Sequence, residues 1–161
     1  LKRLGRMLYC MGHYANAFDY LTDANEMEPS DYETLILLGA VMAEVGDYTS
    51  ALDALQRSLN IEHNADAIAM IGYVYALKGK RTRAAQMIKE LKLATRSHEH
   101  LIKIAQIYAV LAETDTALRL LEQAIERREA DVTAITFDPR WKKIRDEPRF
   151  QALVKGIGLS K

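Results

Sequence analysis

Residues that could perform chemistry are few in this chain and widely spaced. Of its four histidines, His98 and His100 in "HEH" are the only close pair. Their i, i+2 spacing points the two rings to different sides of a helix, whereas a zinc site needs three or four converging ligands. Cys10 stands alone among apolar residues, which excludes an internal disulfide and predicts a packed or exposed thiol rather than a nucleophile.

The common catalytic and nucleotide-binding motifs are absent from the sequence. It contains no G-x-S-x-G, no H-E-x-x-H and no glycine-rich phosphate loop after a strand. We therefore predict no catalytic residues, no bound metal and no cofactor. The sequence indicates a protein that is not an enzyme.

Small residues recur along the chain at intervals of 34, 33 and 33 residues. The first small residue of each copy is Gly5, Gly39, Gly72 or Ala105, and the second, seven residues later, is Gly12, Gly46, Gly79 or Ala112. An alanine follows five residues after the second, at Ala17, Ala51, Ala84 and Ala117. The chain is therefore built from repeats.

Each repeat unit has the apolar spacing of two helices, i, i+3, i+4 and i+7. The first glycine lies where two helices must approach closely, and the second lies where the first helix ends in a left-handed residue. The alanine lets the second helix pack onto the first. We predict helices over residues 2–11, 14–27, 31–45, 48–60, 65–78, 81–94, 98–112 and 115–128.

This period, the pattern L-G…Y…G…A…L/F and Pro29 at the end of the first unit resemble the tetratricopeptide repeat. The resemblance covers about Leu1 to Arg128. It implies an all-α, right-handed superhelical solenoid of about four helix-turn-helix repeats, with a role in protein–protein interaction. We place the solenoid at residues 1–130, with repeats at about 1–30, 31–64, 65–97 and 98–130.

The repeat stops after Glu129, and residues 131–161 form a different segment. A solenoid end exposes the apolar face that another repeat would cover, so we predict that this segment is a C-terminal cap packed on the last repeat. We expect a turn over residues 140–145 and a helix over 148–156. The apolar residues assigned to the cap are Phe137, Trp141, Ile144, Phe150 and Leu153. In the alternative interpretation, Trp141 and its basic neighbours grip a ligand.

The ending "FDPRWKKIRDEPRFQALVKGIGL" also resembles a recurrent ending of tetratricopeptide regions in multidomain bacterial signalling proteins. That resemblance implies a regulatory protein of the bacterial cytoplasm. It also implies a further domain before Leu1, which in those proteins is a nucleotide cyclase, a protein kinase or a winged-helix DNA-binding domain.

Charge is balanced overall but unevenly distributed along the chain. Residues 19–66 carry eleven acids and one base, a balance of −10, whereas residues 78–103 carry eight bases and two acids, a balance of +6. Such opposed regions can steer a complementary partner or drive self-association. The basic stretch "KGKRTRAAQMIKELK" lacks interleaved aromatic residues, so we predict no direct contact with nucleic acid. The longest uncharged run, 67–77, is too short to span a bilayer, and we predict no membrane contact.

The tetratricopeptide resemblance implies that the first helix of each unit lines a concave groove. The residues that register assigns to a partner groove are Arg6, Tyr9, Glu33, Ile36, Ala40, Tyr73, Ala76, Ile102 and Gln106. In the alternative interpretation, Tyr73 and Ile102 are buried by neighbouring helices or by the C-terminal segment. Small and apolar residues dominate this set, which favours an amphipathic helix or an extended apolar segment of a protein or peptide as the occupant. The alternative function is self-association into a homodimer that would dimerise an attached catalytic or DNA-binding domain.

Overall fold

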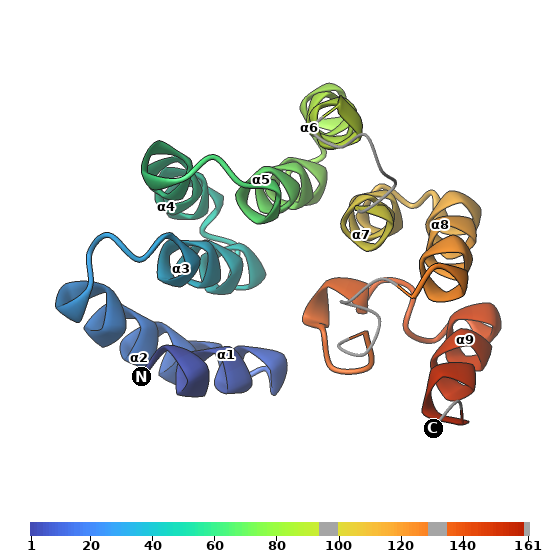
Figure 1. Cartoon of the computed structure of the whole chain (residues 1–161), viewed down its shortest axis with the longest axis horizontal. Coiled ribbons are helices and arrows are strands. Elements are labelled where there is room, and N and C mark those ends of the chain that lie inside the picture. Colours follow the sequence, from blue (N-terminus) through green and yellow to red (C-terminus); the bar gives the residue numbers. More distant parts are fainter. Residues whose placement is uncertain (94–99, 129–134, 160–161) are drawn as a thin grey trace.

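A computed structural model describes residues 1–93, 100–128 and 135–159 of the chain. Within these ranges all regular structure is helical, and the helices succeed one another as antiparallel pairs (Figure 1). The helices of the repeats are α1 (Lys2–Cys10), α2 (Tyr14–Met27), α3 (Tyr32–Glu44), α4 (Tyr48–Ile61), α5 (Ala65–Leu77), α6 (Arg81–Leu93), α7 (Leu101–Val110) and α8 (Thr114–Glu126). The predicted all-α solenoid is confirmed. The predicted repeat boundaries at 97/98 and 130/131 lie outside the described residues.

Side-chain caps begin α3, α4 and α5. Asp31 accepts a hydrogen bond from the backbone N–H of Glu33 at the start of α3, and Asp47 accepts one from Ser50 at the start of α4. Asn64 does the same for Ala67 at the start of α5. These acceptors satisfy amide groups that the helix itself leaves unpaired, so the helix starts follow from local sequence.

The glycines of the repeat have the two roles that their spacing predicts. A Cβ atom at Gly39 would lie 2.7 Å from Cγ of Leu55, and one at Gly5 would lie 2.6 Å from Cγ of Leu21, so α1 and α3 pack directly on their partner helices at these points. Gly46, at the end of α3, has a φ of +87°, a conformation that costs glycine little. In the fourth copy Ala112 adopts the same turn with a φ of +61°.

The interior of the solenoid is built mainly from its first helices. α5 is buried along most of its length, including Ile68, Met70 and Val74, because it has neighbours on several sides. The repeat alanines Ala17, Ala51, Ala84 and Ala117 are each 0% exposed, which places every second helix close to its first helix.

The C-terminal segment contains a short 3-10 helix, η2 (Pro139–Trp141), and the helix α9 (Pro148–Leu159). η2 packs against α7 and α9 packs against α8. Figure 1 shows residues 135–145 lying inside the arc that α1, α3, α5 and α7 form, while α9 continues beside α8. The segment therefore extends onto the concave face of the solenoid.

A concave cavity walled by the C-terminal segment

A cavity of about 360 Å³ lies between the first helices and the C-terminal segment. Seven of the predicted groove residues line it, namely Arg6, Tyr9, Glu33, Ile36, Ala40, Ile102 and Gln106. Ile135, Asp138, Arg140 and Trp141 of the C-terminal segment complete its wall. Its volume is at the small end of the range for ligand pockets, so it has room for a short piece of chain or a small molecule.

Two predicted groove residues lie outside this cavity. Tyr73 is 1% exposed and Ala76 is 6% exposed, and both pack into the hydrophobic core. A partner cannot reach the ring of Tyr73 while the C-terminal segment is in place. Substitution of Tyr73 by a charged residue would therefore probe folding rather than binding.

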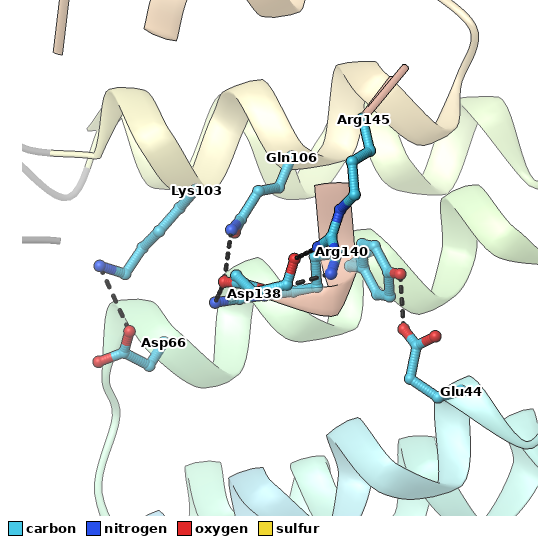
Figure 2. A network of polar contacts seen from close by, with 8 residues as sticks. Glu44, Asp66, Lys103, Gln106, Asp138, Arg140 and Arg145 are labelled. Atoms are coloured by element: carbon cyan, nitrogen blue, oxygen red, sulfur yellow. Dashed lines mark hydrogen bonds and ion pairs between the residues drawn. The ribbon is translucent and has the colours of Figure 1, made fainter. Parts of the chain in front are cut away.

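Asp138 and Arg140 form the polar centre of the C-terminal wall (Figure 2). Nε of Arg140 donates to Oδ1 of Asp138 at 2.9 Å, and Nε2 of Gln106 donates to Oδ2 of the same carboxylate at 2.8 Å. Nη2 of Arg145 donates to the backbone oxygen of Asp138 at 2.8 Å. The turn is thereby tied both to itself and to α7.

The charged form of Asp138 is the stable one in this site. Burial alone would raise the pKa of its carboxyl group, but the guanidinium of Arg140 and its hydrogen bonds, aided by Gln106, hold that pKa below its ordinary value. The pKa of Arg140 is raised, because the neighbouring carboxylate outweighs the desolvation that would lower it. Asp138 and Arg140 therefore remain an ion pair at neutral pH.

A second polar contact joins the C-terminal segment to the second repeat. Nζ of Lys142 lies 2.5 Å from Oε2 of Glu44, whose side chain is 0% exposed, and the hydroxyl of Tyr73 donates to the other carboxylate oxygen. Glu44 thus connects α3, α5 and the C-terminal segment.

The other basic side chains that line the cavity have acidic partners in its wall. Nη2 of Arg6 lies 3.8 Å from Oε2 of Glu33, and Nζ of Lys103 lies 3.3 Å from Oδ1 of Asp66. Because these pairs neutralise one another, the wall has no strong excess of either charge. The cavity therefore suits an uncharged or apolar group better than an isolated ion.

The residues predicted for the cap divide into buried and exposed ones. Trp141, Ile144 and Phe150 are at most 3% exposed and pack with α7 and α8, and Leu153 is half-buried beside them. Phe137 is 68% exposed, because the chain turns there so that the next residue, Asp138, reaches inward to Gln106. Trp141 also lines the cavity, and its ring lies 5.5 Å from the ring of Phe150 between centroids.

Sequence reasoning did not single out Glu44, Asp138 or Arg140. Glu44 and its partner Lys142 are 98 residues apart, and no local pattern relates them. The available signal was Asp-Pro-Arg itself, because an aspartate before proline is a typical helix-start acceptor and the arginine two residues on can bind it.

Cys10 does not have the surroundings of a catalytic cysteine. The thiol of Cys10 is exposed, and desolvation raises its pKa, opposite to the shift that activates a nucleophile. Across 1–93, 100–128 and 135–159, no three His, Cys, Asp or Glu side chains gather as metal ligands would. No helix in these ranges has the length and apolar character needed to cross a membrane.

Paired helices, close approach at the repeat glycines and a concave face made by the first helices define a solenoid of the tetratricopeptide type. The crystal structure of MamA, a tetratricopeptide-like protein, matches with a TM-score of 0.51 and 17% identity, over 96% of this chain and 94% of that one. BBSome complex member BBS4 of Bos taurus is 23% identical over 112 residues. That match covers 69% of this chain and 22% of the length of BBS4. No family model matches the sequence.

Proposed function

We propose that this chain is a non-catalytic protein-interaction scaffold that binds a segment of a partner protein in its concave cavity. The observation that carries the proposal is that the concave face already binds polypeptide, namely residues 135–145, through specific side-chain contacts. The similarity to tetratricopeptide-type proteins supports the same class of function.

The C-terminal segment determines which part of the groove a partner can use. Displacing it would expose Trp141, Ile144 and Phe150, and each side chain of this kind contributes about 1.5–3 kcal/mol when buried. The contacts of a short partner segment cannot offset the summed burial free energy of these three side chains. We therefore place the partner in the remaining cavity, against Ile36 and Ala40 of α3, with the C-terminal segment as its far wall.

A photo-crosslinking experiment tests this placement. Benzoylphenylalanine replaces Tyr32, which lines the cavity, or Gln56, which is exposed on α4 outside it. The expected result is one polypeptide crosslinked in cells from position 32 and not from position 56, with loss of that product in an Ile36→Glu background that keeps its helical circular dichroism. Equal crosslinking from both positions, or none from position 32, would contradict the proposal.

The proposed setting is a regulatory protein of the bacterial cytoplasm, in which the solenoid supplies partner recognition to an attached domain. It rests on the resemblance of the C-terminal segment to the ending of such proteins. Sequencing the gene upstream of Leu1 tests it. A cyclase, kinase or DNA-binding domain supports the setting, whereas an uninterrupted array of repeats favours a plain scaffold.

Self-association is the second candidate, and the N-terminal face favours it. Leu1, Leu4 and Met7 are 51%, 41% and 60% exposed. The three residues at the same register in the next repeat, Leu35, Leu38 and Val41, are at most 6% exposed because the first repeat covers them. Light scattering of the chain with and without Met7→Glu tests this candidate, which requires a dimer that the substitution dissociates.

A further inference from the structure

The junction between the third and fourth repeats differs from the two junctions before it. α2 packs closely on α3, and α4 packs closely on α5, whereas α6 makes much less contact with α7. α6 therefore packs less closely on the next repeat than α2 and α4 do.

A groove of about 650 Å³ lies between α6 and α7, lined by residues of both helices. Figure 1 shows α6 on the side of α7 away from residues 135–145. Its floor is apolar and includes Ile88, which is 4% exposed, and Leu111, which is 8% exposed. The small exposed Ala85 lies on the α6 wall and leaves room for an approaching chain. Tyr108 of α7 adds a half-buried aromatic side chain.

The rim of the groove is basic. Lys89 and Lys92 of α6 line it and are exposed, and their side chains form no ion pair or hydrogen bond with any residue that the structure describes. Arg81 closes one end by donating to the backbone oxygen of Leu111 at 2.9 Å and to Glu113 at 2.7 Å. The groove therefore has an apolar floor and two positive charges that no described acidic side chain neutralises.

We propose that this groove binds an acidic segment of a partner protein that also carries apolar side chains. The apolar side chains would cover Ile88 and Leu111, while carboxylates would pair with Lys89 and Lys92. Nucleic acid fits less well, because Glu113 lies on the rim and Tyr108 is the one aromatic residue of the lining. The groove is separate from the concave cavity, so the two proposals can fail independently.

The test is fluorescence anisotropy of the folded chain with a labelled peptide of alternating glutamate and leucine. Lys89→Glu combined with Lys92→Glu should weaken binding about tenfold or more, since each reversal replaces an attraction by a repulsion. The control pair, Lys80→Glu with Arg83→Glu, makes the same charge change near the start of α6 but outside the lining, and should leave binding nearly unchanged. Added salt should also weaken binding.

A second variant tests the groove without altering charge. Ala85→Trp should fill the space above Ile88 and reduce peptide binding while circular dichroism stays unchanged, because residue 85 is exposed. Ile36→Glu in the concave cavity should have no effect on this peptide.

Several outcomes would overturn the proposal. These are absence of binding, equal losses from the control pair, and equal affinity for a peptide in which glutamine replaces every glutamate. A single-stranded oligonucleotide of equal charge that binds more tightly than the peptide would reassign the groove to nucleic acid.

Discussion

The hydroxyl of Tyr73 donates a 2.7 Å hydrogen bond to Oε1 of Glu44, joining α5 to α3 on the concave side of the solenoid. The same carboxylate binds Lys142 of the C-terminal segment through its other oxygen. One buried acid therefore links two repeats and the segment that crosses them. A tyrosine that sequence register assigns to partner binding is engaged inside the protein instead.

Removing the Tyr73 hydroxyl should destabilise the protein. Tyr73→Phe leaves Glu44 without one of its donors, and we expect a loss of about 1–2 kcal/mol in the free energy of unfolding by urea. Tyr9→Phe is the matched control, because the buried hydroxyl of Tyr9 has no hydrogen-bond partner among the described residues. That variant should be neutral or slightly more stable, and equal losses in both would show that the Glu44 bond contributes nothing.

Stability should decline at alkaline pH through the same tyrosines. Burial, followed by the charge of Glu44, raises the pKa of Tyr73, and burial raises that of Tyr9. Below about pH 10 both are protonated in the folded and unfolded states, and stability is unaffected. Above about pH 10 the unfolded state loses protons that the folded state keeps. The free energy of unfolding therefore falls by about 1.4 kcal/mol per pH unit for each tyrosine.

Urea unfolding of wild type and Tyr73→Phe between pH 9 and pH 11.5 measures this contribution. The free energy of unfolding of the variant should fall less steeply with pH than that of wild type, because one of the two tyrosines is missing. Identical slopes would mean that Tyr73 ionises in the folded state as readily as in the unfolded one.

Asp138→Asn should loosen the C-terminal segment. The substitution leaves the largely buried guanidinium of Arg140 without its counter-charge, and we expect a loss of about 3 kcal/mol. Trp141 is the single tryptophan of the chain and is fully buried beside this pair, so its fluorescence reports on the segment directly. In the variant its emission should shift to the red at lower urea than the loss of helix; coincident transitions would indicate that the segment and the solenoid unfold together.

Ala112→Gly should stabilise the protein. Ala112 has a φ of +61°, in the left-handed region where earlier repeats carry glycine, and relief of that strain exceeds the entropy that glycine adds to the unfolded chain. The expected gain is about 0.5 kcal/mol by thermal unfolding. Gly46→Ala makes the reverse change at a φ of +87° and should lose about 1 kcal/mol.

Gly39→Ala should be destabilising although alanine favours helix. The new Cβ would lie 2.7 Å from Cγ of Leu55 and 3.2 Å from the backbone oxygen of Ala51, which forces α3 and α4 apart. We expect a loss of about 2 kcal/mol. Gly156→Ala in α9 meets no atom within 4 Å and should gain up to about 1 kcal/mol instead. A stabilising Gly39→Ala would refute the close approach.

Much of the fold could be predicted from the sequence because its causes are local or periodic. Helix starts depend on acceptors such as Asp31 and Asn64 within a few residues of the amides that they bind. Pairing of the two helices within each unit depends on glycine and alanine at a constant spacing. The same close helix–helix contact therefore recurs every 33 or 34 residues.

Register likewise predicted the set of concave residues, but it did not determine which of them remain accessible. Glu33 and Ile36 line the cavity, whereas Tyr73 belongs to the core. Accessibility depends on where the chain goes after its last repeat. Neither Asp138, which reaches Gln106, nor Lys142, which reaches Glu44 across 98 residues, has a periodic relation to its partner.

By itself, then, the sequence determined the repeat, the paired helices and the close contacts within each pair, since these follow from short-range chemistry at fixed spacing. The tertiary structure decided that the C-terminal segment crosses the concave face, that Tyr73 is buried beneath it and that α6 stands apart from α7. The physical reason is that these features depend on the course of the whole superhelix. It brings together side chains that are far apart along the chain and have no periodic spacing, so no sequence pattern predicts their contact.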